Sequence, residues 1–344
     1  MSAHNIPDFR VTLGDRDLTG FLRGTVRDSE TARPRPRLVS LSISEKRGEE
    51  ADELDIVIDD TDGRVDLPPE GAILHVHIGW KQGGEVTPGL VDKGSFTVDE
   101  VSHAGPPDLI TIKGRSADFI KDLKLRREKG HADTTLGAIV ADIAKRHGLK
   151  PRCAPALASI AVKAKAQSRE SDMAFLRRLG RENDAAATIK AGILILKPIG
   201  DGSSAAGEAL PALTIRRRDG DGHSFTRAKR EEAEGVTAEY HDRGSARRES
   251  VTVGKGDGRK LARVYATRAD AEAAAKATKG RAARQPVTMS MTLALGRADI
   301  FPEQRATVSG YKPQIDAVRW LVTEVTHAIG ERGYSTTLKL ENAA

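Results

Sequence analysis

Hydrophobic and polar residues alternate one by one through much of the first third of the chain. Apolar residues take every second position at 41–43 and again at 54–58. A period of two is typical of β-strands, which turn one row of side chains toward a core. The same pattern recurs over 73–80, 96–101 and 109–113. Turn-forming pairs such as Asp-Gly and Gly-Gly separate the runs, so this region is predicted to be β structure.

The period then changes, and apolar residues recur every three or four positions, as on one face of a helix. Ser116 can cap a first helix, and Thr134 or Asp133 can cap a second helix that Gly148 ends. A third helix is predicted over 171–183, with acids at its start and arginines toward its end, as the helix dipole favours. The apolar faces of the three helices comprise Phe119, Ile120, Leu123, Leu136, Ile139, Val140, Ile143, Phe175, Leu176 and Leu179.

β patterning returns in the last part of the chain. The runs 185–189 and 193–197 are predicted to form a hairpin, and 201–207 is polar and glycine-rich, as linkers are. An alanine-rich helix is predicted over about 267–279, ended by Gly280. Strands are predicted over 236–240, 250–253, 287–293, 305–311, 320–325 and 334–340. The chain is thus β, then mixed α/β, then β.

The two β regions resemble each other in sequence. Residues 63–70 match residues 296–303 without a gap, and residues 96–103 match residues 320–327 further on in the same order. Either one chain carries two copies of the same β module, or the two regions share β patterning by convergence. A histidine ends the second motif in both copies, which favours a role in the fold or an interface over catalysis. The motif residues, for which we predict a structural role, are Gly63, Arg64, Asp66, Pro69, Glu70, Val98, Glu100, Val101 and His103 in the first copy and Gly296, Arg297, Asp299, Pro302, Glu303, Val322, Glu324, Val325 and His327 in the second.

The composition is that of a globular protein with a heavily charged surface, because 38% of the 344 residues are hydrophobic and 30% are charged. This length favours two or three domains. No run of about 18 apolar residues occurs, so no membrane span is predicted. The first residues lack the pattern of a secretory signal. Cys153 is the only cysteine, so an internal disulfide is excluded, and this fits folding in a reducing cytoplasm. No nucleophile motif surrounds Cys153.

The formal net charge of +6 raises the question of a nucleic-acid or acidic-lipid partner. Basic and acidic residues are interleaved, however, and even the densest basic run, 216–218, is followed by Asp219 and Asp221. Aromatic residues make up 4% and do not stand between the basic ones, as a surface for single-stranded nucleic acid requires. A solvated charged surface is the favoured interpretation, and direct DNA binding is the alternative.

No local pattern of catalytic or metal-binding residues emerges. The acidic turn 59–63 resembles a calcium loop, but the register that places Gly63 correctly puts Ile58 at the first ligand position. His75 and His77 share one face of a strand, yet no third ligand stands at a telling spacing, so we expect exposed strand histidines. We therefore predict no catalytic residue, no metal ligand, no cofactor and no enzymatic activity.

With these residues in view, the chain resembles the late control protein D family of temperate contractile-tailed phages. The most specific likeness is the stretch Gln-Ser-Arg-Glu-Ser-Asp-Met-Ala-Phe-Leu-Arg-Arg-Leu at 167–179. Further points of likeness lie at 41–43, 51–56, 59–63, 94–101, 105–108, 114–118, 147–149 and 320–341. The likeness therefore runs through nearly the whole chain.

This resemblance implies a baseplate hub of the α+β class, mainly β, with two tube-like antiparallel β-barrel domains and an inserted α/β domain. The first barrel is expected over 1–115, completed by part of 185–215. The inserted domain is expected over 116–200, and the second barrel over 208–344 with a helical insertion near 267–280. Such hubs form homotrimers, in which six barrels match a sixfold tail tube above while three chains match a threefold spike below.

The implied partners are the tail tube protein, the spike protein, other baseplate proteins and the tape measure protein, in a virion tail assembled in the host cytoplasm. The spike is expected to be a separate protein, DNA is expected only to pass through the lumen, and no membrane partner is expected. The hub design is shared with type VI secretion spikes and phage-tail-like bacteriocins, so a hub of such a particle is one alternative. A tail-associated hydrolase of peptidoglycan or peptides, seated in 116–197, is another.

Overall fold

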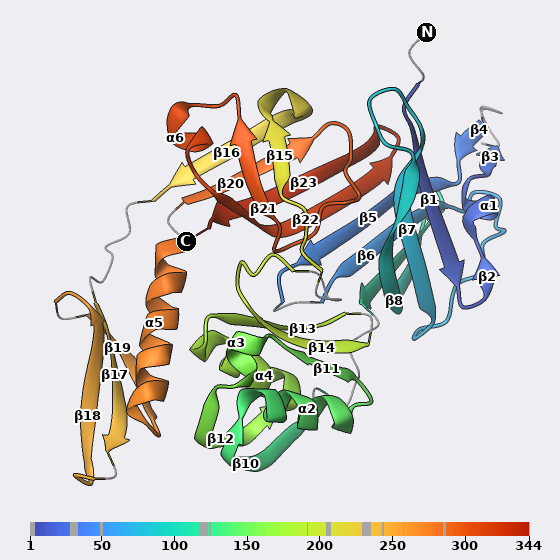
Figure 1. The fold of residues 1–344 in the computed structure, drawn as a ribbon. Coiled ribbons are helices and arrows are strands. Elements are labelled where there is room, and N and C mark those ends of the chain that lie inside the picture. Colours follow the sequence, from blue (N-terminus) through green and yellow to red (C-terminus); the bar gives the residue numbers. More distant parts are fainter. Residues whose placement is uncertain are drawn as a thin grey trace.

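The computed structural model describes residues 4–27, 34–48, 51–116, 123, 125–190, 192–203, 208–228, 235–242, 244–256, 258–284 and 287–343. The protein is mainly β, with one large, mostly antiparallel sheet, a smaller α/β domain and a group of strands beside one long helix (Figure 1). The predicted α+β class, mainly β with an α/β middle part, is confirmed. Among the described residues, no helix is long and apolar enough to cross a membrane.

The N-terminal half of the large sheet, called here the first module, has six main strands. They are β1 (Ile6–Leu13), β5 (Leu38–Lys46), β6 (Glu53–Asp59), β7 (Ile73–Gln82), β8 (Gly89–Ala104) and β9 (Leu109–Ser116). Short elements accompany them: β2 (Arg16–Asp17), α1 (Thr19–Leu22), β3 (Thr25–Arg27) and β4 (Pro34–Pro36). The strand order is β5-β6-β9-β8-β7-β1. Alternate side chains, among them Leu41, Ile56 and Val76, fill one core, as the period of two predicts.

The C-terminal half of the sheet is the second module. Its strands are β15 (Leu213–Arg216), β16 (Gly220–Arg227), β20 (Val287–Leu293), β21 (Arg305–Ser309), β22 (Trp320–Gly330) and β23 (Gly333–Asn342), accompanied by η2 (Arg217–Asp219) and α6 (Pro313–Asp316). The order β16-β20-β23-β22-β21-β15 repeats that of the first module strand for strand. One difference is that β15 runs parallel to β21, whereas its counterpart β1 runs antiparallel to β7.

The correspondence extends to local irregularities. The pairing of β8 with β9 slips after Val98, and the pairing of β22 with β23 slips after Val322. The amide of Gly71 donates to the Val98 carbonyl, and the amide of Glu303 donates to the Val322 carbonyl, each at 2.8 Å. Gly71 and Glu303 also share a left-handed backbone, with φ of 82° and 73°. The counterpart of Glu303 is therefore Gly71 and not Glu70, so the ungapped sequence match is wrong by one residue at that end.

The two modules are joined edge to edge. β5 of the first module pairs with β22 of the second, which makes one continuous 13-stranded sheet (Figure 1, blue and red strands). The strands within 185–215 were expected to complete the first barrel, and this is wrong. Two of them pair only with each other and with a third strand of the middle domain, and Leu213–Arg216 pairs within the second module.

The middle domain combines short sheets with two main helices. Its elements are β10 (Arg126–Thr135), α2 (Leu136–Arg146), β11 (Lys150–Cys153), α3 (Pro155–Ala158), β12 (Ala161–Ser171), α4 (Asp172–Glu182), β13 (Ala185–Lys190) and β14 (Ile193–Pro198). The predicted apolar faces of α2 and α4 fill its core. Thr135 caps α2, not Thr134 or Asp133, because the hydroxyl that accepts the Ala138 amide, at 3.2 Å, is that of Thr135. Of the helix predicted after Ser116, residues 117–122 lie outside the described part, and Leu123 is buried in this core.

A third group of strands is inserted between β16 and β20. It consists of β17 (Gly235–Asp242), β18 (Arg247–Gly254), β19 (Arg259–Tyr265) and α5 (Arg268–Arg284). The Thr267 hydroxyl accepts the Asp270 amide at 3.1 Å and so caps α5, at the start of the predicted range. The predicted end at Gly280 is wrong, because α5 continues to Arg284, whose Nη1 donates to Asp184 at 2.8 Å. This contact with the middle domain stabilises the last turn beyond the glycine.

Candidate functional site: the junction between the two modules

An aromatic pair holds the two modules together on the apolar side of the junction. The rings of Trp80 on β7 and Tyr334 on β23 have centroids 5.3 Å apart. Trp80 Nε1 also donates to the carbonyl of Gly296 at 2.8 Å. A Cβ atom at Gly296 would lie 2.4 Å from the Tyr334 ring, so only glycine fits there. A residue of the first module is therefore anchored inside the second.

A fully buried ion pair of the first module lies at the same junction and contacts the second module. Lys93 Nζ on β8 lies 2.7 Å from Glu45 Oε2 on β5, and His327 Nε2 on β22 lies 3.3 Å from the same oxygen. All three side chains are at most 3% exposed. Lys93 Nζ also donates to the carbonyl of Ile300 at 3.3 Å and lies 3.9 Å from the centre of the Phe301 ring. Charges of the first module thus find partners in the second.

These contacts shift the pKa values of Glu45 and His327. Burial alone would raise the pKa of Glu45, but Lys93, His327 and Lys190 outweigh it and hold that pKa below its ordinary value. Burial, with repulsion from Lys93, lowers the pKa of His327 to about 4, so its ring is neutral at pH 7. His327 Nδ1 lies 3.0 Å from the Tyr334 hydroxyl. The arrangement is a fixed ion pair beside a neutral histidine, which suits a structural joint.

The middle domain also contacts this group of charged side chains at the junction. Lys190 Nζ on β13 lies 3.0 Å from Asp52 and 3.7 Å from Glu45. We call Glu45, Asp52, Lys93, Lys190 and His327 the junction cluster. Its residues come from both modules and the middle domain, so these three parts of the chain meet around one set of buried and half-buried ionisable side chains.

The repeated motifs occupy different environments in the two copies. His327 is buried and its counterpart His103 is exposed, while Val325 is buried and Val101 is half-buried. The other buried motif residues are Val98, Val322, Gly296 and Glu303. The half-buried ones are Arg297, Pro302 and Glu324, and the exposed ones are Gly63, Arg64, Asp66, Pro69, Glu70, Glu100 and Asp299. The second copy is the more buried one because β5 pairs along β22 and covers it.

The counterpart of that covered edge is open in the first module. The stretch 324–330 of β22 pairs with β23 on one side and with β5 on the other. The corresponding stretch 100–104 of β8 pairs with β9, and no described strand pairs with its other side. β16, the counterpart of β5, pairs with β20 alone among the described strands. Among the described strands, each module therefore has one unpaired edge: part of β8 in the first and β16 in the second.

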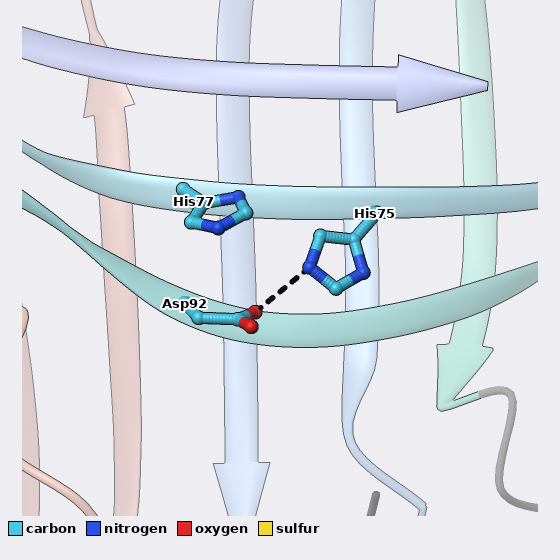
Figure 2. A group of neighbouring side chains, drawn as sticks. All are labelled: His75, His77 and Asp92. Carbon is cyan, nitrogen blue, oxygen red and sulfur yellow. Dashed lines mark ion pairs between the residues drawn. The ribbon is translucent and has the colours of Figure 1, made fainter. Parts of the chain in front are cut away.

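Asp92 is a neighbour of two histidines that the sequence reasoning missed. His75 and His77 are half-buried on β7 and not exposed, and Asp92 Oδ1 on β8 lies 3.1 Å from His75 Nε2 (Figure 2). One ligand atom from each of the three residues lies within 4.8 Å of the others. The available signal was the Gly-Gly turn at 83–84, which predicts pairing of the strands that flank it.

A model of the phage tail baseplate hub (GPD) family matches residues 71–333. The chain belongs to this family. It is 39% identical to the probable baseplate hub protein of Escherichia phage P2 over 376 residues, which cover 97% of this chain and 93% of that protein. The resemblance to phage hub proteins is therefore confirmed, and this hub chain is a component of a phage tail baseplate.

Solved structures share the fold of this hub chain at low sequence identity. The 43 kDa tail protein of prophage MuSo2 from Shewanella oneidensis superposes with a TM-score of 0.66 at 13% identity, covering 97% of this chain and 98% of that one. The E. coli c3393 protein, a component of the type VI secretion system, superposes with a TM-score of 0.53 at 13% identity, covering 89% and 74%. The hub fold thus extends to type VI secretion, as the resemblance implied.

Proposed function

We propose that three copies of this hub chain close into a ring of six modules, which joins a sixfold tail tube to a threefold spike. The supporting observation is the repeated strand order of the two modules, joined by β5 and β22. A threefold assembly of a duplicated module has six similar positions, so it can match one symmetry on each face. We propose three domains, at 1–115, 116–200 and 208–344, as expected from the sequence. The first domain does not include the strands within 185–215.

The joint within the chain serves as the template for the joint between chains. Following the strand pairings, Ile43 on β5 corresponds to Phe225 on β16, and His327 corresponds to His103. His327 lies opposite Ile43 in the joint within the chain. We therefore place His103 of one copy opposite Phe225 of the next, with Ser102 opposite Thr226.

The exposure of these residues supports the same pairing. His103, Ser102 and Thr226 are exposed, and Phe225 and Val101 are half-buried in the single chain. Their counterparts at the internal joint are all buried or half-buried. Open strand edges favour the addition of another strand, so a second copy of the chain is a fitting partner.

A disulfide between chains tests the register. Directly opposite residues of an antiparallel pair have Cα atoms about 4.5–5.5 Å apart, which a disulfide can bridge. In a Cys153→Ser background, Ser102→Cys with Thr226→Cys is expected to give covalent dimers and trimers on a non-reducing gel after mild oxidation. The control pair, Ser102→Cys with Ser250→Cys on the exposed strand β18, is expected to stay monomeric. Light scattering should give three chains per particle, and a stable monomer that also fails to bind tube and spike proteins would refute the proposal.

The remaining parts of the proposal concern partners and activity. We propose that tube, spike, other baseplate and tape measure proteins bind the ring during assembly in the host cytoplasm. DNA passes through the lumen without tight binding, and the chain catalyses no reaction. A gel shift at several salt concentrations is expected to show no strong salt-sensitive binding, which a DNA-gripping lumen would produce. Zymography on peptidoglycan is expected to show no clearing.

A further inference from the structure

We propose that His75, His77 and Asp92 form a binding site for a divalent transition metal ion, of the class that includes Zn²⁺. This inference does not depend on the ring proposed above, because every residue in it belongs to the first module of one chain. Two imidazoles and one carboxylate are a ligand set that Zn²⁺ uses, with further positions left for water or an incoming group.

Strand geometry brings the three groups together. His75 and His77 are two positions apart on β7, so both side chains stand on the face opposite to the core that Leu74, Val76 and Ile78 fill. Figure 2 shows both rings beside the stretch of β8 that carries Asp92. The three ligand atoms already lie within 4.8 Å of one another, so small rotations of the side chains bring them around one ion.

A bulge in β8 sets the position of Asp92. His75 pairs with Ser95 and His77 pairs with Asp92, so β8 uses one more residue than β7 over this stretch. Gly94 takes a left-handed backbone there, with φ of 90°, and its amide donates to Asp92 Oδ1 at 2.7 Å. The backbone itself therefore orients the carboxylate toward the histidines.

A second contact orients one of the imidazoles. His75 Nδ1 lies 2.8 Å from Ser95 Oγ, which leaves Nε2 facing Asp92. Ligand histidines in metal sites are held in this way through their other ring nitrogen. At His77, the buried Nδ1 has no hydrogen-bond partner within the part of the chain that the structure describes. Its imidazole is thus not engaged by a competing polar group at that nitrogen.

The surrounding charges are compatible with a cation. On the neighbouring strand β1, Arg10 lies opposite His77 and Thr12 lies opposite His75. Arg10 is paired with Asp17 at 3.5 Å, which partly offsets its charge.

Metal titration of the full chain tests the site. The protein, freed of any histidine tag and treated with EDTA, is titrated with Zn²⁺ in a calorimeter and with Co²⁺ in an absorbance experiment. One ion per chain is expected to bind, and Co²⁺ should develop visible absorption bands from imidazole ligands. His77→Ala and Asp92→Asn are expected to abolish binding, and Ser95→Ala is expected to weaken it about tenfold or more.

A matched control separates the site from adventitious binding to surface histidines. His241→Ala removes an exposed strand histidine on β17 and is expected to bind one ion with unchanged affinity. Circular dichroism of each variant shows whether it is folded, and only folded variants are compared. Absence of one-to-one binding by the wild-type chain, or equal binding by folded His77→Ala, overturns the proposal.

Discussion

The two β modules follow one path through space yet differ in what surrounds them. The second module has its β22 edge covered by β5, and its motif histidine is buried against Glu45. In the first module no described strand pairs with the corresponding edge of β8, and His103 is exposed. The difference teaches that a sequence repeat fixes a fold but not a role. Residues at equivalent positions become a joint in one copy and a free surface in the other.

The largest expected effect comes from breaking the buried ion pair between Lys93 and Glu45 at the junction. Lys93→Ala leaves Glu45 buried with one partner fewer, and loss of one member of a buried pair costs about 3–5 kcal/mol of unfolding free energy. The exposed pair Glu100–Lys113 of the first module, at 3.2 Å, provides the control. Glu100→Ala is expected to cost less than about 1 kcal/mol. Urea unfolding measures both, and similar losses would contradict the assigned difference between the two surfaces.

The second largest effect is expected from replacing His327, compared with replacing His103 at the equivalent position of the first module. The pKa of His327 is lowered to about 4, so between pH 4 and its ordinary value of 6.5 the unfolded chain binds more protons than the folded one. Stability from this residue is therefore complete above pH 6.5 and is lost as pH falls toward 4, by about 3 kcal/mol in all.

Comparison of variants isolates that contribution. Burial raises the pKa of Asp52 and Glu303, and these groups change stability in the opposite direction. His327→Gln is expected to flatten the loss of unfolding free energy between pH 7 and 4.5 relative to wild type. His103→Gln is expected to keep the wild-type slope. A slope that survives in His327→Gln assigns the pH dependence to other groups.

The smallest expected contrast lies in the two motif glycines. Gly296→Ala places a methyl group against the Tyr334 ring, and such overpacking costs about 1–3 kcal/mol. At Gly63 no atom stands in the way, and the cost of alanine is that of a left-handed φ of 61°, about 1–2 kcal/mol. Thermal unfolding should show the larger loss for Gly296→Ala. The Gly296→Ala variant should also show a shift in tryptophan fluorescence, because Trp80 is then held less tightly against the second module.

Local patterns in the sequence predicted much of the fold. The period of two located β5 to β9 of the first module and β20 to β23 of the second, but not β1, β15 or β16. The helix predicted over 171–183 is α4, which begins after Ser171 and ends before Asn183. β19 was missed because Arg259 and Lys260 interrupt any apolar alternation. The end of α5 was missed because it depends on Asp184, a residue 100 positions away.

The candidate site was harder to predict because it depends on contacts between distant segments. The pairing of Ser44 with Thr326 joins strands 282 residues apart, and nothing in either strand names its partner. Lys93 is charged yet fully buried, which no hydrophobicity pattern predicts. Only the fold shows that the β8 bulge turns Lys93 to the junction and Asp92 to the histidines.

The unpaired sides of β8 and β16 carry a consequence for the life of the free chain. A subunit with two complementary unpaired strand edges can polymerise head to tail. The rotation between neighbouring subunits decides whether the polymer closes into a ring. A small error in that angle produces an open filament in place of a closed ring, and exposed strand ends also recruit unrelated chains into aggregates. Closure of the proposed ring would protect every such end at once, so we expect assembly to be most efficient when the chain is synthesised at a level that favours rapid completion.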